Sequence, residues 1–347
     1  MKVSMFNYDA IPAVRQSLDD LVKNHYSLYY KALVSGEKVD ETSFDWSSFL
    51  NCGLASSANG EILFRYRCSR LMDDFLFTDR VDYVGADRVL YLSDNESLLR
   101  AQSMPQCKGA SALDIGTGSG VQSIAAYRRG ASQVISVDVS PRAVEVARFN
   151  LTLNGLPQKG VILADFGQFE SDETFDLIVS NPPFVPVPKN TTFMTSGAGG
   201  EDGLDFVRLI LHKCKTFLAP GGTLCLVSIS TGGLAFSELE RMLVEHFYDD
   251  SVCIDVQNIF PKSVGMDRFL EVFLGASEVS VWERTFQKRG LTHLHNLLIT
   301  VSKSSRWEFH RSDLVPSLSV PVENKGSVDW PGYLDEIRLA RASAGAE

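Results

Sequence analysis

The stretch that decides the fold is residues 112–120, Ala-Leu-Asp-Ile-Gly-Thr-Gly-Ser-Gly. Its first residues alternate as in a buried strand, and Asp114 stands where that strand ends. Gly116, Gly118 and Gly120 allow backbone angles and close approaches that a Cβ atom would prevent. Residues 121–129 then have helical spacing, and Gly130 ends them. The stretch therefore predicts a strand, a glycine loop and a helix.

Three ligand classes and a plain turn compete for this loop. A phosphate-binding P-loop is excluded, because that motif needs Gly-Lys-Ser/Thr, whereas Val121 and Gln122 follow Gly120. A dinucleotide loop has glycines spaced Gly-x-Gly-x-x-Gly, whereas these glycines alternate. The pattern Asp-x-Gly-x-Gly-x-Gly suits S-adenosylmethionine, and a glycine-rich turn without a ligand is the structural alternative.

A second strand and helix follow at once. Residues 133–138 form a short β-rich run that ends in Asp138, and a carboxylate at this position is placed to accept both hydroxyls of a ribose. Ser140 and Pro141 then predict a helix start, and an apolar stripe runs to the stop signal at residues 154–155. Residues 161–164 predict a third strand. The chain thus repeats a β-loop-α unit.

A fourth strand carries the motif that indicates the chemistry. Residues 174–180 predict a strand, and it delivers Asn181, Pro182, Pro183 and Phe184. Two prolines cannot continue a central strand or a helix, so they predict a rigid turn. Open α/β sheets bind ligands at the carboxyl ends of their strands, which is where this turn lies.

With these motifs in register, the chain resembles class I S-adenosylmethionine-dependent methyltransferases with an Asn-Pro-Pro-Tyr/Phe motif, a group that includes the HemK/PrmC and RsmC-like families. The resemblance implies an α/β fold with a Rossmann-like, seven-stranded sheet and helices on both faces, plus a smaller mixed α+β N-terminal region. It covers residues 88–230, and the Gly-Gly-Glu-Asp-Gly-Leu-Asp run at residues 199–205 also resembles HemK-type proteins. Residues 92–97 depart from the Pro-Arg-Pro-Glu-Thr segment of that family. The resemblance implies that the catalytic residues are Asn181, Pro182, Pro183 and Phe184. It also implies that the cofactor is bound by Asp114, Gly116, Thr117, Gly118, Gly120, Asp138, Val139, Asp165, Phe166 and Asn181.

The resemblance implies N-methylation of a planar amide or amine, because the proteins of that group modify nitrogens. Such a nitrogen is a poor nucleophile, because its lone pair is conjugated. If the Asn181 side-chain oxygen and the Pro182 carbonyl each accept one N–H, the lone pair is aimed at the methyl donor. Phe184 would stack on the planar group. No histidine base or metal is required.

Several acceptors remain open at this stage. A protein or peptide glutamine ranks first, because of the run at residues 199–205 and the net charge of −10. An RNA or DNA exocyclic amine ranks second, and a small metabolite third. An NAD-dependent oxidoreductase and an inactive binding module are the alternatives from other classes.

Composition sets outer limits on the kind of protein. The 347 residues are 44% hydrophobic and 22% charged, which is an ordinary globular balance. No apolar run reaches the length of a membrane span and the N-terminus lacks a signal-peptide pattern, so a cytoplasmic protein is expected. The six cysteines show no Cys-x-x-Cys pair, which predicts reduced, mostly buried thiols. His293 and His295 alternate, but a packing role is favoured over a metal pair, and no metal is expected.

The chain is expected to have three parts. Residues 1–105 form an N-terminal substrate-recognition or capping region, with a helix over 14–34 that Gly36 ends and a hairpin turned at 72–74. Residues 106–305 form the methyltransferase domain, and residues 306–347 a C-terminal tail. Two runs compete for the last, antiparallel strand, 269–274 and 296–301, and the second is favoured. The loop at residues 185–200 is expected to be mobile and to lie near the substrate.

Overall fold

A computed structural model describes most of the chain. The described residues are 4–80, 82, 83, 85, 87–89, 95–188, 197–248, 250–259, 264, 265, 279–288 and 290–313. The chain divides into two compact units, one made of residues 1–172 and 179–181 and the other of residues 173–178 and 182–347. The three-part division expected from the sequence stays a prediction.

The main sheet has the predicted Rossmann-like character. Its hydrogen-bonded order is β14-β11-β13-β10-β9-β6-β7-β8, and β12 pairs with β13. β6, β7 and β8 are parallel to one another, as repeated β-loop-α units require. The strands of this sheet are β6 (Ser111–Ile115), β7 (Gln133–Asp138), β8 (Val161–Leu163), β9 (Phe175–Ser180), β10 (Leu218–Gly232), β11 (Val252–Asn258), β12 (Val264–Gly265), β13 (His293–Lys303) and β14 (Glu308–Asp313).

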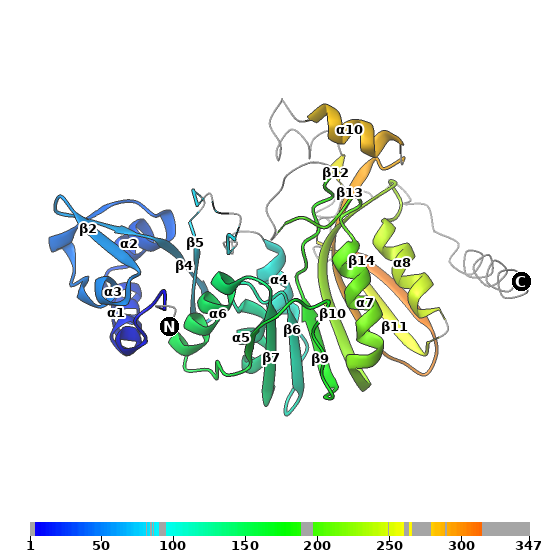
Figure 1. Cartoon of the computed structure of the whole chain (residues 1–347), viewed down its shortest axis with the longest axis horizontal. Coiled ribbons are helices and arrows are strands. Elements are labelled where there is room, and N and C mark those ends of the chain that lie inside the picture. The colour runs from blue at the N-terminus through cyan, green and yellow to red at the C-terminus, as the bar shows by residue number, and fades with distance from the viewer. Residues whose placement is uncertain are drawn as a thin grey trace, which may run out of the picture. The chain divides into compact units, whose positions relative to one another are not determined.

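Helices pack on the sheet within each unit. In the first unit, α5 lies against β6 and β7, and α6 against β7 and β8 (Figure 1). In the second unit, α7 and α8 lie against β10, and α8 also contacts β11. The helices that follow the N-terminal region are α4 (Asn95–Ser103), α5 (Val121–Arg128), α6 (Pro141–Leu153), α7 (Asp205–Phe217), α8 (Glu238–Phe247) and α10 (Val279–Lys288).

The end of the sheet differs from the expectation in one respect. Residues 296–301 lie in β13, which is antiparallel to β10 and β11, whereas residues 269–274 lie outside the described part of the chain. The region expected to be a tail begins with β14, which pairs in parallel with β11 and adds a strand to the seven expected. The serine-, proline- and acid-rich composition beyond residue 307 hides this strand, because pairing along the β11 backbone does not need an apolar sequence.

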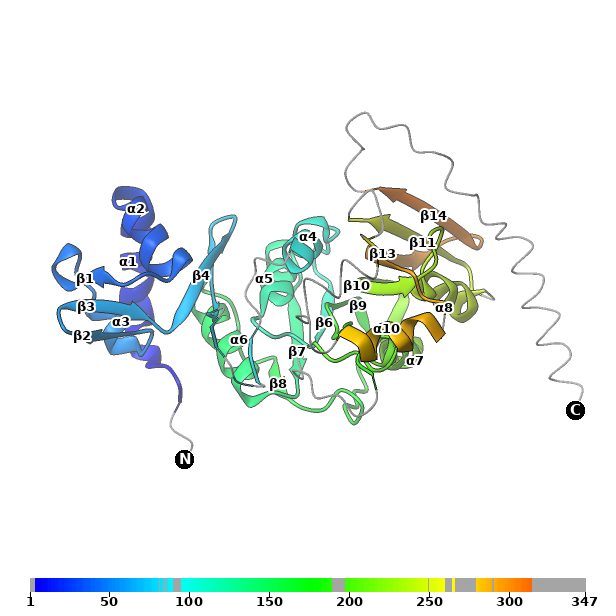
Figure 2. The same cartoon turned by 90° about the horizontal axis from the view of Figure 1, so that it is seen from above.

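The N-terminal region is mixed α+β, as predicted. The helix expected over residues 14–34 begins earlier, is interrupted at His25 and continues as a π-helical turn that Gly36 ends with φ of +72°. The predicted hairpin is present, with β4 and β5 antiparallel. The elements are α1 (Ile11–Asn24), α2 (Tyr26–Tyr29), the π-helical turn (Tyr30–Ser35), β1 (Val39–Asp40), α3 (Ser47–Cys52), β2 (Ala55–Ala58), β3 (Glu61–Phe64), β4 (Tyr66–Leu71) and β5 (Asp74–Asp79); Figure 2 shows them from above.

This N-terminal region shares its hydrophobic core with α6. The buried cluster that contains Val14, Leu18 and Phe49 also contains Val146 and Phe149 of α6. The rings of Phe6 and Phe149 stack with centroids 4.3 Å apart. The outward face of α6 therefore belongs to the N-terminal core rather than to solvent.

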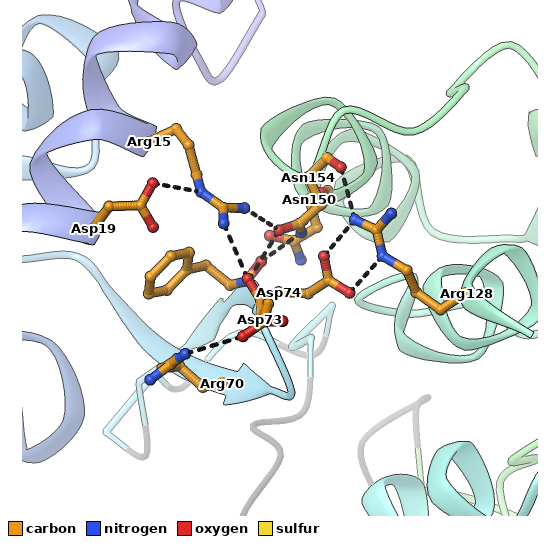
Figure 3. A network of polar contacts seen from close by, with 9 residues as sticks. Arg15, Asp19, Arg70, Asp73, Asp74, Arg128, Asn150 and Asn154 are labelled. Atoms are coloured by element: carbon orange, nitrogen blue, oxygen red, sulfur yellow. Dashed lines mark hydrogen bonds and ion pairs between the residues drawn. The ribbon is translucent and has the colours of Figure 1, made fainter. Parts of the chain in front are cut away.

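Two asparagines of α6 also take the place of a neighbouring strand for β5. Asn150 accepts from and donates to the backbone of Phe77 at 2.8 Å, and Asn154 does the same with Phe75 at 2.8–3.0 Å; Figure 3 shows both asparagines. Four residues of helix rise about 6 Å, close to the roughly 6.6 Å between alternate residues of a strand. The spacings match, so one helix face satisfies the edge of β5.

Ion pairs surround this junction. Arg128 at the end of α5 makes two hydrogen bonds to the buried carboxylate of Asp74, at 2.6 and 2.9 Å, and a third to the Asn154 carbonyl (Figure 3). At the other end of β5, Arg142 pairs with Asp79, which is fully buried. Both ends of β5 are thereby fixed to the helices that follow β6 and β7.

Candidate functional site

The glycine loop is held against the end of β7. The backbone N–H groups of Gly116 and Thr117 both donate to the Val137 carbonyl, at 2.8 and 3.1 Å. The Gly118 N–H donates to the carboxylate of Asp138 at 2.9 Å, and the Ser140 N–H donates to its other oxygen. The loop and the acid at the end of the next strand therefore form one hydrogen-bonded unit.

The three glycines have different reasons to be glycine. All have positive φ, between +54° and +81°. A Cβ atom at Gly116 would meet no atom within 4 Å, and one at Gly118 would meet only the Gly116 carbonyl at 3.9 Å. At Gly120 it would lie 3.3 Å from Ala147 of α6. Gly120 thus allows helix packing, whereas Gly116 and Gly118 border open space beside the loop.

Asp114 is a buried carboxylate with an unused acceptor. One oxygen accepts from the hydroxyls of Thr117 and Ser123 at 2.7 and 2.6 Å, and the other, Oδ1, is buried without a hydrogen-bond partner. Burial raises the pKa of Asp114 to about 6, and the nearby charge of Asp138 adds to this. Burial also raises the pKa of Asp138. Among the described residues, no positively charged side chain is a main cause of either of these pKa shifts, so the two carboxylates favour a ligand that carries a positive charge.

The remaining predicted cofactor residues lie at or after the ends of neighbouring strands. Val139 follows Asp138 and is 58% exposed, so its side chain is available to an aromatic ring. Asp165 is exposed, and its carboxylate accepts from the Gly167 N–H at 2.8 Å. Phe166 is buried at 4% exposure and stacks on Phe169. Contact of Asp165 and Phe166 with an adenine ring stays a prediction.

Asn181 presents one end of its amide. Its Nδ2 donates to the Ser97 hydroxyl of α4 at 2.7 Å, and its Oδ1 is buried without a partner among the described residues. A buried acceptor left unpaired costs about 1–3 kcal/mol, so this oxygen is suited to an N–H donor from a ligand. The preceding residue, Ser180, donates to the Ile115 carbonyl at 2.7 Å and fixes the strand end beside the glycine loop.

The other residues of the predicted catalytic motif belong to the second unit. Phe184 is half-buried and packs on a cluster that contains Val185, Trp282 and Phe286. Its backbone is enclosed by the run at residues 199–205, because a Cβ atom at Gly203 would lie 2.3 Å from the Phe184 carbonyl oxygen. This close approach is a physical reason for glycine in the run. Pro182 is buried and Pro183 half-buried.

The loop after this motif is tied at both ends. Val185 pairs with Ala198 in a parallel bridge, and the Val187 N–H donates to the Gly200 carbonyl at 2.7 Å. Residues 189–196 lie outside the described part of the chain. The expected mobility of residues 185–200 stays a prediction.

Three contributors to the site were not identified from the sequence. The Ser97 hydroxyl accepts from Asn181 at 2.7 Å, Gln122 donates to the Ser97 carbonyl at 2.9 Å, and Asn150 donates to the Ser119 carbonyl of the loop at 2.8 Å. The available signal was weak: polar residues at positions of helices that are otherwise buried. Residues 90–94 and the side chain of Glu96 are not among the described residues. Most of the divergent segment at residues 92–97 is therefore not described either.

The histidines and cysteines have other surroundings. His295 Nε2 bonds the Gly233 carbonyl and His293 Nδ1 bonds Thr292, both at 2.8 Å. All six cysteines are outside disulfide bonds, and four of them are buried, as expected of mostly buried thiols. Among the described residues, one group brings three potential metal ligands within 4.8 Å, Cys253, Glu308 and His310. Arg306 already pairs with Glu308 at 2.7 Å and would compete with a cation there.

No helix in the described part of the chain combines the length and the apolar character that crossing a membrane demands.

Comparison with known proteins places the site in context. Residues 106–290, just over half of the chain, match the family described as "Methyltransferase domain". The chain is 36% identical over 157 residues to the release factor glutamine methyltransferase of Geobacter sulfurreducens. The aligned segment covers 42% of this chain and 54% of that protein. It is 35% identical over 153 residues to the protein of the same name from Rhodospirillum rubrum, covering 41% and 47%.

A solved structure also aligns with the chain. It is the T. thermophilus 16S rRNA N2 G1207 methyltransferase (RsmC) in complex with AdoMet and guanosine, with a TM-score of 0.40 and 16% identity over 83% of this chain and 63% of that one. The chain spans about half the length of the curated relatives it matches.

Proposed function

Because the chain belongs to the methyltransferase-domain family, we propose that it transfers a methyl group from S-adenosylmethionine to the side-chain amide nitrogen of a glutamine in a protein or peptide. The observation that carries the proposal is the Asn181 amide, whose nitrogen is bonded and whose buried oxygen has no partner. The matched relatives named release factor glutamine methyltransferase support a glutamine acceptor.

The residues around the glycine loop fit this cofactor. Gly116 and Gly118 leave space above the loop, and the carboxylate of Asp138 would accept the hydroxyls of the ribose. Asp114 and Asp138 together supply negative charge in a largely buried setting. When bound, S-adenosylmethionine supplies an electrophilic methyl group on a positively charged sulfur.

The chain's own contribution to the reaction is orientation. An amide nitrogen is a weak nucleophile because its lone pair is delocalised. Asn181 Oδ1 would accept one N–H of the acceptor amide, and the Pro182 carbonyl is the predicted acceptor for the other. Two such bonds fix the plane of the amide and the direction of its lone pair. They also polarise the N–H bonds, which favours the positive charge that develops on the nitrogen.

The charge of the chain supports a protein acceptor over a nucleic acid. With 33 basic and 43 acidic residues, the net charge is −10. Proteins that bind nucleic acids neutralise phosphates with lysine and arginine, and a net negative chain opposes that approach unless a basic face is concentrated.

The test uses methyl-labelled S-adenosylmethionine and a glutamine-containing peptide from a release factor. We expect label on the glutamine, none on the matched peptide with asparagine, and binding of S-adenosylhomocysteine by calorimetry. Asn181→Ala should retain that binding and lose transfer. Label that appears only in RNA, DNA or a metabolite fraction of cell extract would contradict the acceptor, and binding of NAD instead of S-adenosylhomocysteine would contradict the reaction class.

A further inference from the structure

We propose that Ser97 is a positioning residue for methyl transfer: its hydroxyl holds the side-chain amide of Asn181 in the orientation that turns Oδ1 toward the acceptor nitrogen. This inference rests on the proposed function and adds a residue to its machinery. Ser97 lies 84 positions before Asn181 in the chain and reaches it from α4.

The direct evidence is the pair of environments at the two ends of the Asn181 amide. Nδ2 lies 2.7 Å from Ser97 Oγ, and Oδ1 is buried and has no partner. An amide has two ends of nearly equal size but opposite hydrogen-bonding character. A serine hydroxyl can bond either end of an amide, and in the structure it bonds the nitrogen end, which leaves the oxygen end as the acceptor. The reverse orientation would present N–H groups to the N–H groups of the acceptor, and two donors repel.

Ser97 is itself held in place from the first turn of α5. Its side chain is buried, at 8% exposure, and its carbonyl accepts from Gln122 Nε2 at 2.9 Å. Gln122 is the second residue of α5, two positions after Gly120, and is 2% exposed. The first turn of α5, which follows the glycine loop, therefore holds Ser97, and Ser97 bonds the Asn181 amide.

Packing makes this chain of contacts stiff. α4 packs along α5, so the start of α4 cannot move without disturbing the helix that opens at the loop. Rotation of the Asn181 amide about its last torsion angle is otherwise soft, because such terminal torsions have broad preferences. A directional bond at one end is what restricts this rotation.

The experiment compares Ser97→Ala with Ser97→Thr and with a matched control. Thr keeps the hydroxyl. Ser103→Ala removes a hydroxyl from the last turn of the same helix, where it bonds only backbone carbonyls of Leu99 and Arg100 and does not touch Asn181. For each protein we would measure kcat and KM with the glutamine peptide, the affinity for S-adenosylhomocysteine, and the ¹⁵N–¹H signals of the Asn181 side-chain amide.

We expect Ser97→Ala to lower kcat by about tenfold or more, since a misoriented group at the reacting atom costs this order. The affinity for S-adenosylhomocysteine should change less than about twofold, a difference well below 1.4 kcal/mol. The Asn181 amide signals should shift in Ser97→Ala, and Ser97→Thr should recover both the signals and kcat. Ser103→Ala should match the wild type.

Two results would overturn the positioning role: Asn181 amide signals that are the same in Ser97→Ala as in the wild type, or a kcat that does not fall when those signals shift. Failure of the proposed function is recognised separately. If the wild type transfers no methyl group to the glutamine peptide, the acceptor is wrong, while a shift of the Asn181 signals in Ser97→Ala and its reversal in Ser97→Thr still support the positioning of the amide.

Discussion

Replacing Asn150 by alanine should weaken both the fold and the cofactor site. Asn150 is fully buried and makes three hydrogen bonds of 2.8 Å, two with Phe77 of β5 and one with the Ser119 carbonyl of the glycine loop. Alanine would leave three buried backbone groups without partners. Each such group costs about 1–3 kcal/mol, and partial access of water to the site reduces the sum. We therefore expect a loss of about 3 kcal/mol in the free energy of unfolding.

Asn154 offers a matched control one helical turn away. It makes the same pair of bonds to Phe75 of β5, accepts a further bond from Arg15 at 3.0 Å and donates to the Asn150 carbonyl at 2.8 Å, but makes none to the glycine loop (Figure 3). Asn154→Ala should therefore lose about 3 kcal/mol in the free energy of unfolding, as Asn150→Ala does, with the affinity for S-adenosylhomocysteine unchanged within about twofold. Asn150→Ala should in addition weaken that affinity by about tenfold, because the Ser119 carbonyl loses its anchor.

Urea unfolding and calorimetry measure the two effects. The urea midpoint should fall in both variants at an unchanged slope, which shows that stability and not compactness has changed. Equal cofactor affinities in the two variants would refute the link between Asn150 and the loop. An unfolding free energy of Asn150→Ala within about 0.5 kcal/mol of the wild type would refute the larger argument that these amides replace a strand.

Three further outcomes follow from single residues. Burial raises the pKa of Asp114 in the folded state to about 6, so the folded state binds this proton more tightly than the unfolded state does. The free energy of unfolding should therefore be highest below about pH 4 and fall by about 3 kcal/mol as pH rises to about 6. Urea titrations of Asp114→Asn across this pH range should lack that loss. Gly120→Val should unfold at a lower temperature, because a side chain there meets Ala147 at 3.3 Å in a backbone with φ of +81°, and a melting curve equal to that of the wild type would contradict this reading. Gly203→Ala should lower kcat more than it lowers the affinity for S-adenosylhomocysteine, because its Cβ would displace the Phe184 backbone; steady-state kinetics and calorimetry separate the two, and an unchanged kcat would show that Phe184 tolerates the shift.

The parts that could be predicted from the sequence carry their signals locally. The strand bounds of β7 and the helix bounds of α6 agree with the predictions, because Asp138, Ser140 and Pro141 mark a strand end and a helix start within a few residues. The Ser140 hydroxyl accepts from the Ala143 N–H as a helix cap does.

The parts that could not be predicted depend on partners far away in the chain. Asn150 bonds a residue 73 positions earlier, and Ser97 bonds one 84 positions later. A lone asparagine or serine in a helix has several ordinary roles, and only the tertiary neighbours decide among them. β14 was missed for a related reason, since its six residues alternate only weakly in burial and owe their order to pairing with β11.

The N-terminal region should not be removable without loss of the fold, and this decides how its predicted role in substrate choice can be tested. Val146, Phe149 and Leu153 of α6 are buried in the same core as the N-terminal helices and would be exposed by deletion of residues 1–79. Full burial of such side chains contributes about 1.5–3 kcal/mol each, so the deletion forfeits several kcal/mol from α6 alone, besides the bonds of Asn150 and Asn154. We expect the truncated chain to aggregate or to unfold by circular dichroism at temperatures where the full chain is folded. A truncated chain that melts like the wild type and binds S-adenosylhomocysteine equally well would contradict the shared core.

Since the deletion confounds folding with recognition, substrate choice is better tested at exposed residues that lie outside this core. Tyr26 and Tyr30 are 58% and 51% exposed, so Tyr26→Ala and Tyr30→Ala should leave the melting temperature unchanged. A raised KM for the peptide in these variants would place recognition on the N-terminal region.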